Sequence, residues 1–424
     1  MTNTVSMSEI DNLLNYTIDN NIRLQETGVT PIAVSLEASA GIGKTSIVRQ
    51  IAEKRGMGFV KLNLSQLDES GDLLGFPQTE YECQTARRVK EKDGTVKVHV
   101  LPGTTWLTDR QISGMDKSIA VRQTGKTRMS YAKPAWVPEY TDNGTIVLLD
   151  DWSRANSQLL QAVMDLVLEQ KYISWSLPKK TTIVLTSNPD DGTNNVSSLD
   201  EAQVTRFMNF SIEWSQDAWA QWAEAEGIDG RCINFVLSYS NELFQADGEG
   251  NRICNPRSFV MFANMISGIK DWDDKHNLAF ISSISRGCFH DDNGRFSQMF
   301  SSFIRNKMHL LIQPKDMLLK PWEEVRSILE TAMYDEDGQY RADISSLLER
   351  RFVNFVNAWL DSKEQTPIAK VKDRILDFID NEENGGKRLF NQDLYYHMIK
   401  TITSKHKSQT NKLLFEPKIA KILS

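Results

Sequence analysis

Cysteine is scarce in this chain, which has four cysteines among its 424 residues: Cys83, Cys232, Cys254 and Cys288. No two of them form a C-x-x-C pair, so neither a disulfide framework nor a zinc site is expected, and the reducing cytoplasm is the expected compartment. No apolar run approaches the ~20 residues that span a bilayer. The first residues, MTNTVSMSEIDNLLNY, lack a basic segment followed by an apolar one. We therefore expect no secretory signal and no membrane partner.

Positive charge is in the minority, but one segment collects it. The chain carries a net charge of −7, from 49 Lys and Arg against 56 Asp and Glu. Between Tyr81 and Ala132 there are ten basic and five acidic residues, a net charge of +5, which leaves −12 for the remainder. This balance argues against a protein that coats nucleic acid over its whole surface, and it permits one local basic contact surface.

The chain is longer than one ordinary core requires, so two or three domains are expected. Apolar runs at 31–38, 57–64, 144–151 and 179–192 predict buried strands, with helical patterns at 45–56 and 156–170 between them. This alternation predicts an α/β fold with a parallel sheet and helices on both faces. Beyond Trp214 only helices are predicted, at 215–227, 233–244, 257–269, 297–312, 345–360 and 369–380. The expected domains are an α/β domain over 1–212, a helical domain over 213–312 and an all-α domain over 313–424.

Residues 38–45 read ASAGIGKT, which matches the phosphate-binding pattern G-x-x-x-x-G-K-[ST] except at Ala38. A loop between a buried strand and a helix N-terminus points its backbone N–H groups at an anion, and alanine is tolerable at its start if φ stays negative. The lysine supplies charge at the β and γ phosphates, and the threonine a hydroxyl for Mg²⁺. We expect a nucleotide to contact Ala40, Gly41, Ile42, Gly43, Lys44, Thr45 and Ser46.

A second Gly-Lys-Thr occurs at 125–127, in VRQTGKTRM. No predicted strand precedes it, and Gly125 is the only glycine nearby. We predict a surface loop there, without a role in phosphate binding.

Polar residues follow two further predicted strands. Asp150 and Asp151 end GTIVLLDD, and Asn188 ends TTIVLTSN. A carboxylate at 150 is placed to hold Mg²⁺, although a helix N-cap would also explain it. The amide at 188 can orient a water against the γ-phosphate, with a turn before Pro189 as the alternative.

Five stretches occur in a fixed order: ASAGIGKTS, GTIVLLDDWSRANSQLLQAVMDLVLEQ, VLTSNPDDG, LDEAQVTRFMNF and NPRSF. Together, over roughly residues 10–300, they resemble an AAA+ ATPase, most closely the MoxR-type branch of the helix-2-insert clade. The resemblance implies a P-loop NTPase core, an α-helical lid at 213–312, ATP and Mg²⁺ as cofactors, and a homo-oligomeric ring, usually a hexamer. It gives Lys44 and Thr45 the Walker A roles, Asp150 the Walker B role and Asn188 the role of sensor 1.

The resemblance also implies roles for two arginines. Arg206, in VTRFMNF, matches the arginine finger that reaches a neighbouring subunit's ATP, and Arg257, in NPRSF, matches the sensor-2 arginine of the lid. A fixed guanidinium can neutralise the charge spread over a transferring phosphoryl group. The alternatives are a surface arginine that caps a strand for Arg206, and a salt bridge at a helix start for Arg257.

The chain departs from this family at two places. The family usually has Glu after the Walker B aspartate, and this side chain polarises the attacking water. Here the residue is Asp151, whose side chain is about 1.5 Å shorter, and this difference predicts a slow ATPase. In addition, 106 residues separate Lys44 from Asp150, and the excess lies in an insert at 77–136, where the family has a hairpin. The insert carries the +5 charge, and VKVHVLPG at 96–103 predicts a strand. It is expected to contact an anionic partner, with a solvated surface excursion as the alternative.

The sequence therefore predicts an ATP-driven ring that remodels or assembles a protein client. The main alternative is a nucleic-acid motor or clamp-loader-like ATPase, which the basic insert and the basic tail from Lys400 favour and the acidic net charge disfavours. A third possibility is an ATP-dependent assembly scaffold with little turnover, suggested by Asp151.

Overall fold

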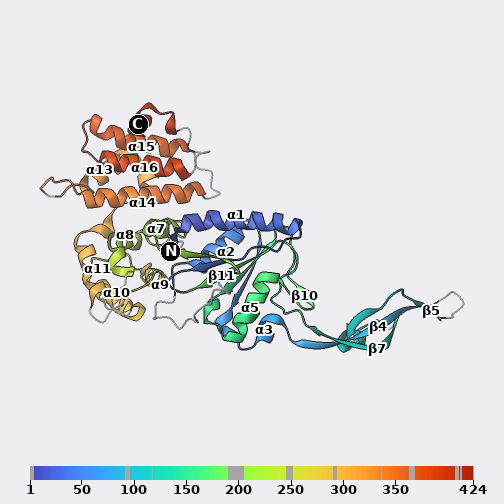
Figure 1. Ribbon diagram of the computed structural model, residues 1–424. Helices are drawn as coiled ribbons and strands as arrows, with labels where there is room; N and C mark the ends of the chain where they lie inside the picture. Colours follow the sequence, from blue (N-terminus) through green and yellow to red (C-terminus); the bar gives the residue numbers. More distant parts are fainter. Residues whose placement is uncertain are drawn as a thin grey trace. The chain divides into compact units, whose positions relative to one another are not determined.

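A parallel sheet of six strands lies at the centre of residues 1–213 in the computed structural model (Figure 1). Its strands are β1 (Thr4–Val5), β2 (Val34–Glu37), β3 (Gly58–Asn63), β8 (Thr145–Asp150), β11 (Thr181–Ser187) and β12 (Met208–Ile212), in the spatial order β1-β12-β2-β11-β8-β3. The carboxyl ends of β2, β11 and β8 therefore lie side by side at one edge. The structure describes residues 4–90, 96–116, 118–189, 205–244, 252–289, 294–335, 337–361, 368–405, 410 and 413–423.

Helices cover both faces of this sheet, which explains why its central strands are continuously apolar. Ile146 and Leu148 of β8 pack in one cluster with α1 (Met7–Glu26) and α2 (Lys44–Lys54). The alternate residues Val147 and Leu149 pack in a second cluster with α3 (Ser70–Leu74) and α5 (Ser157–Glu169). The side-chain period of two along a strand sorts the residues to the two faces. The predicted α/β class, with a parallel sheet between helices followed by a helical region, is confirmed.

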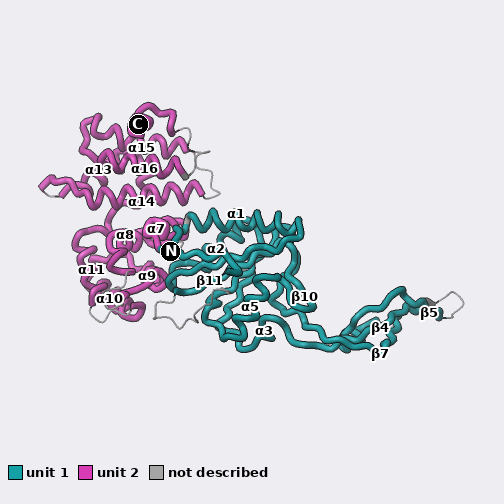
Figure 2. The backbone as a smooth tube through the Cα atoms, viewed as in Figure 1, with its two compact units in different colours: residues 1–213 teal, residues 214–424 magenta. Residues whose placement is uncertain are grey.

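The chain divides into two compact units, residues 1–213 and 214–424 (Figure 2). The first unit also contains the short strands β9 (Lys171–Tyr172) and β10 (Trp175–Ser176), and the 3₁₀ turns η1 (Leu64–Gln66) and η2 (Trp152–Arg154). The first unit ends at Glu213, and the predicted division of the chain into domains over 1–212, 213–312 and 313–424 stays a prediction.

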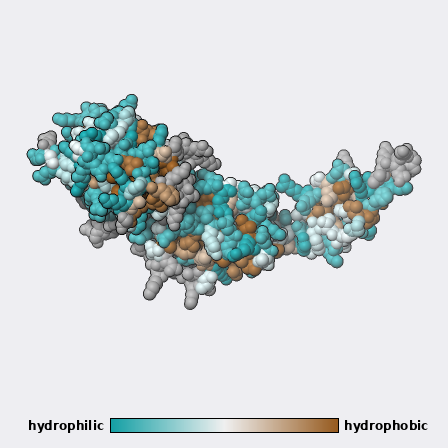
Figure 3. Space-filling view, turned by 90° about the horizontal axis from the view of Figure 1, so that it is seen from above, coloured by the Kyte–Doolittle hydropathy of each residue, from teal (hydrophilic) through white to brown (hydrophobic). Residues whose placement is uncertain are grey.

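The insert is a separate antiparallel sheet within the first unit. Its long central strand β4 (Pro77–Lys90) pairs with β7 (Ile119–Tyr131) on one side and with β5 (Val96–Val100) and β6 (Thr105–Thr108) on the other. The short helix α4 (Asp109–Ser113) follows β6. The second Gly-Lys-Thr lies within strand β7, so the predicted loop at 125–127 is wrong, although its residues are exposed. Apolar surface is visible on this sheet in the space-filling view (Figure 3).

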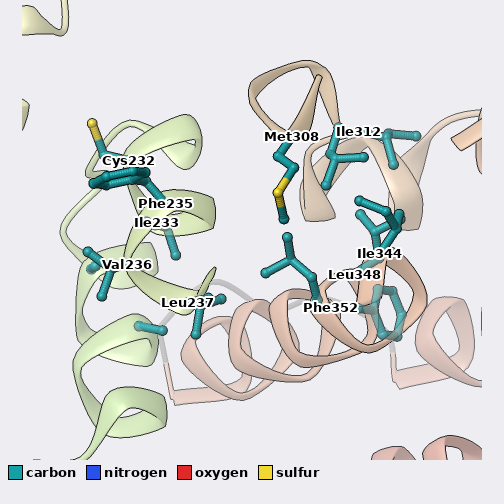
Figure 4. Packing of buried hydrophobic residues seen from close by; sticks show 14 of the residues in the cluster. Cys232, Ile233, Phe235, Val236, Leu237, Met308, Ile312, Ile344, Leu348 and Phe352 are labelled. Carbon is teal, nitrogen blue, oxygen red and sulfur yellow. The ribbon is translucent and has the colours of Figure 1, made fainter. Parts of the chain in front are cut away.

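The second unit is helical over its described residues. Its helices are α7 (Gln216–Ala225), α8 (Gly230–Phe244), α9 (Pro256–Ile266), α10 (Lys275–Cys288), α11 (Arg295–Arg305), α12 (Pro314–Leu319), α13 (Trp322–Ala332), α14 (Ala342–Asp361), α15 (Ile368–Glu383), α16 (Gln392–Lys405) and α18 (Pro417–Leu423), with the 3₁₀ turn η3 (Met308–Leu310). One apolar cluster joins both parts of this unit, because Ile233 of α8 and Met308 belong to the same cluster as Leu348 of α14 (Figure 4). The helix predicted over 297–312 is too long: α11 ends at Arg305, and Lys307 takes a left-handed conformation with φ 56°.

Candidate functional site

The loop that joins β2 to α2 has the backbone that its glycines predict. Gly41 and Gly43 have φ of 84° and 102°, in the left-handed region where any side chain would be strained. Ala38 is buried, and it is not among the described residues with positive φ, so the alanine that replaces the usual glycine is tolerated there. Gly43 is the N-cap of α2, which points the first N–H groups of this helix into the loop.

Lys44 is the one buried residue of the predicted contact set 40–46. Its ammonium group donates hydrogen bonds to the carbonyl oxygens of Ala38 (2.5 Å) and Ser39 (3.3 Å) and to Oδ1 of Asn188 (3.0 Å). Burial raises the pKa of the neighbouring carboxyl of Glu37, and the charge of Lys44 offsets part of that rise. The lysine therefore connects the loop to the end of β11.

Asp150 lies one strand further along the same edge, and its carboxylate is surrounded by donors. The hydroxyl of Thr45 lies 3.1 Å from Oδ1 and 3.3 Å from Oδ2, and the hydroxyl of Thr186 donates to Oδ1. The ammonium of Lys61 lies 2.6 Å from Oδ2. Burial alone would raise the pKa of Asp150, but the hydrogen bonds from Lys61 and Thr186 and the lysine charge hold this pKa below its ordinary value. The carboxylate is therefore ionised at neutral pH.

The structure thus brings together Lys44, Thr45, Asp150 and Asn188, which the sequence placed in three separate segments. Two further members of the site, Lys61 and Thr186, were not predicted. Their signals are weak: a single lysine inside the apolar run MGFVKLNL, and a threonine two residues before Asn188.

Asp151 follows directly, in an unusual backbone conformation. Its φ of 52° and ψ of 37° are left-handed, a conformation that aspartate tolerates better than most residues. Its backbone N–H points at the hydroxyl of Thr186, at 3.4 Å. The chain therefore turns sharply at the end of β8, and η2 begins there.

Arg206 does not belong to this cluster. It precedes β12, whose first residue Met208 is level with Val34, whereas the phosphate loop begins at Ala38. Four residues of strand, or about 13 Å at ~3.3 Å per residue, therefore separate the level of Met208 from that of Ala38, and Arg206 lies two residues further away. This distance is more than an arginine side chain spans. The guanidinium lies instead 3.3 Å from the carboxylate of Asp165, on α5.

A shallow pocket of about 310 Å³ lies beside Arg206. It is lined in part by Ile32 and Leu168, whose side chains are exposed although they are apolar. The described part of the first unit thus presents an arginine and apolar residues at the end of the sheet opposite to the phosphate loop.

Arg257 lies in the second unit, as the second residue of α9. The helix starts with a capped first turn, in which the side chain of Asn255 accepts a hydrogen bond from the N–H of Ser258 at 2.9 Å, and Pro256 occupies the first helical position. The arginine is exposed, and no acidic residue accompanies it in the first turn. A cation at a helix N-terminus is disfavoured by the helix dipole, so local stability does not explain this residue.

The first unit fits a magnesium nucleotide by its chemistry. The loop offers backbone N–H groups and a lysine to phosphate oxygens, while the hydroxyl of Thr45 and the carboxylate of Asp150 are hard oxygen ligands of the kind that Mg²⁺ prefers. Elsewhere, the described residues contain no cluster of three or more His, Cys, Asp and Glu that could hold a metal ion. No helix of the described ranges is both long and apolar enough to cross a membrane.

No protein-family model and no curated protein matches this chain. Among solved structures, a candidate ATPase of Cytophaga hutchinsonii is similar to 85% of this chain and 79% of its own, with 13% identity and a TM-score of 0.27. The Holliday junction branch migration motor RuvB of Thermotoga maritima is similar over 67% of this chain and 70% of its own, with 11% identity and a TM-score of 0.32. Scores this low assign no activity to the chain.

Proposed function

We propose that this chain is an ATP-binding and ATP-hydrolysing protein of the AAA+ class that assembles into a ring of identical subunits. One observation carries the proposal: Lys44, Thr45, Asp150 and Asn188 meet at the carboxyl edge of three neighbouring parallel strands. A loop with two left-handed glycines and a buried lysine at a helix N-terminus is suited to the phosphates of a nucleotide.

Each residue of the candidate site would have a separate role in ATP hydrolysis. Lys44 would neutralise the β and γ phosphates, and Thr45 and Asp150 would hold Mg²⁺, which lowers the charge repulsion against an attacking water. The amide of Asn188 would orient that water. The hydrogen bond from Lys44 to Oδ1 of Asn188 holds this amide beside the phosphate loop. Arg206 would complete the site of the next subunit, because it lies too far from the site of its own chain.

Equilibrium binding of a fluorescent ATP analogue and steady-state phosphate release test this function directly. The full chain is expected to bind the analogue in the presence of Mg²⁺ and to release phosphate slowly. If it binds neither ATP nor ADP, the proposal is wrong. Tight binding without turnover in any oligomeric state would instead support the assembly scaffold.

We predict that Asp151→Asn lowers the turnover number by about 10²-fold and leaves nucleotide affinity within about twofold, because the carboxylate acts on the attacking water and not on the bound phosphates. Asp151→Glu should keep or raise the rate, since it restores the usual side-chain length. The measurement is single-turnover hydrolysis with saturating enzyme. An unchanged rate in Asp151→Asn would remove this residue from the mechanism.

The insert is the proposed contact surface for a partner. Val96, Val98 and Val100 of β5 are each more than half exposed, and they share one face of the strand because side chains alternate. Within the described part of the insert, β5 is an edge strand that pairs only with β4. Arg87 and Arg88 of β4 are exposed beside it. An extended polypeptide with apolar and acidic side chains fits such an edge by strand addition.

Part of the basic charge of the insert is already paired. Arg128 lies 2.7 Å from the carboxylate of Glu80, and Lys126 lies 3.5 Å from that of Glu82. Nucleic acid binding depends on cations that are available to the phosphates, so these pairs and the exposed valines favour a protein client over DNA. The MoxR-type branch, whose members resemble this chain in sequence motifs, agrees with a protein-remodelling role.

A deletion can test the insert cleanly because Gln78 and Ser130 are cross-strand partners at its base. We predict that replacing residues 79–129 by Asn-Gly, a favoured two-residue turn, leaves nucleotide affinity within about twofold. The variant keeps the hydrogen bond from Trp136 to the carbonyl of Leu73. A glutamate–tyrosine copolymer should stimulate the ATPase of the native chain about threefold or more, and should not stimulate the variant.

Two controls accompany this measurement. Val98→Asp changes one exposed side chain of β5 and should lower the stimulation without affecting the basal rate. Single- and double-stranded DNA are tested at several salt concentrations. Stimulation by DNA with a steep salt dependence would favour the nucleic-acid motor, and stimulation that survives the deletion would exclude the insert as the contact surface.

A further inference from the structure

Lys61 is a charged residue at the edge of the candidate site that none of the motifs accounts for. It lies on β3 level with Leu148, two residues before Asn63, which is level with Asp150. Residues that are level in neighbouring strands point to the same face, so Lys61 and Asp150 share the face that α2 covers. The lysine stem spans this offset of two residues along the strands, and Nζ lies 2.6 Å from Oδ2 of Asp150.

The contacts of Asp150 divide unevenly between its two oxygens. Oδ1 accepts hydrogen bonds from the hydroxyls of Thr45 and Thr186. Oδ2 receives the ammonium of Lys61, with Thr45 at the longer distance of 3.3 Å. The single full positive charge in contact with this carboxylate, among the described residues, is therefore Lys61. A divalent cation held between Thr45 and Asp150 would draw on the same negative charge.

The two partners differ in their exposure to water. The side chain of Asp150 is 11% exposed, whereas that of Lys61 is 36% exposed. A lysine ammonium is strongly hydrated and sits on a flexible stem, so it can move to water at little cost when another cation arrives. Lys44 differs in this respect, because it is buried and donates to three acceptors of the loop and of β11.

We propose that Lys61 is an exchangeable counter-ion of Asp150. Lys61 pairs with this carboxylate in the metal-free protein, and the pairing sets the Mg²⁺ concentration at which the site binds a magnesium nucleotide. The inference rests on the proposed function, since it concerns the same site. It assigns Lys61 a positioning role: without the lysine, the buried carboxylate would have no full positive charge beside it and would bind the metal more readily.

The test is a Mg²⁺ titration of the binding of a fluorescent ADP analogue to the full chain. Lys61→Met removes the charge and keeps the length of the side chain, and we expect the half-saturating Mg²⁺ concentration to fall about three- to tenfold. Lys61→Gln should behave in the same way, and Lys61→Arg should remain within about twofold of the native chain. Lys133→Met, which removes another lysine–carboxylate pair of the first unit at 3.2 Å, serves as the matched control and should change nothing.

A second readout needs no nucleotide. In EDTA, Lys61→Met should melt about 2–4 °C below the native chain, because the charge of Asp150 is left unpaired, and the difference should shrink with saturating Mg²⁺ and ADP. A half-saturating Mg²⁺ concentration that is unchanged or higher in both Lys61→Met and Lys61→Gln would overturn the role of Lys61 while nucleotide binding stands. If the native chain binds no analogue at all, the proposed function fails and this inference fails with it.

Discussion

Replacing Lys44 by Ala is expected to weaken ATP binding by about a hundredfold or more and to abolish turnover. The ammonium is the buried cation of the phosphate loop, and hydrogen bonds to charged groups contribute about 1.5–3 kcal/mol each. Because the affinity depends on this charge meeting the β and γ phosphates, the loss should appear in Kd for ATP and ADP alike. Isothermal titration calorimetry of the full chain with each nucleotide measures it.

The chain supplies its own control for this experiment. Lys126 belongs to the second Gly-Lys-Thr, is 73% exposed on strand β7, and lies 3.5 Å from a carboxylate oxygen of Glu82. Lys126→Ala should leave both dissociation constants unchanged, because no helix N-terminus follows that strand. If Lys126→Ala removes binding and Lys44→Ala does not, the site has been assigned to the wrong copy of the motif. Circular dichroism melts of both variants check that the loss is not due to unfolding.

The sequence predicted the candidate site best where an apolar strand pattern is followed directly by residues suited to phosphate binding. The buried strands β2, β8 and β11 are short apolar runs, and each one ends in residues with an obvious use at a phosphate site: the glycine-rich loop, Asp150 and Asn188. Since parallel strands align their carboxyl ends, these three segments were expected at the same edge once the sheet was predicted, and they meet because β2, β11 and β8 are neighbours. Ala38 could also be judged in advance, because its backbone requirement follows from sterics.

Lys61 and Thr186 could not be predicted, because their roles depend on strand order and register. The pairing that puts Asn63 level with Asp150 brings Lys61 within reach of the carboxylate, and no sequence pattern specifies this pairing. A shift of one residue would send Lys61 to the other face of the sheet. Thr186 likewise contacts Asp150 only because β11 and β8 are neighbours.

The insert was under-predicted for a related reason. Strands β4 and β7 are rich in charged and polar residues, and little of their surface is buried, so the alternation that marks a half-buried strand is weak. Their pairing joins residues as far apart as Pro77 and Tyr131, which local analysis does not detect. The loop predicted at 125–127 was wrong because no strand was predicted before it, whereas the segment lies within β7, where Gly125 has φ 94°.

Replacing Arg206 by Ala is expected to lower the turnover number by about 10³-fold while nucleotide affinity stays within about twofold. The guanidinium lies at the opposite end of the sheet from the phosphate loop, so the proposed role requires that it reach the nucleotide of another subunit. It would stabilise charge in the transition state, which is why the effect should appear in kcat and not in Kd. Single-turnover hydrolysis by the assembled oligomer, with its mass checked by light scattering, is the measurement.

Mixing two inactive variants tests whether this arginine acts between subunits. Arg206→Ala chains retain a complete phosphate loop, and Lys44→Ala chains retain the arginine, so random 1:1 assembly should rebuild about a quarter of the interfaces and a corresponding part of the activity. Asp165→Ala, which removes the partner of Arg206 within the chain, should leave the rate unchanged. If Asp165→Ala is as harmful as Arg206→Ala, and mixing restores no activity, then Arg206 is a structural residue of its own chain. The proposal that two subunits share each nucleotide site would then be wrong.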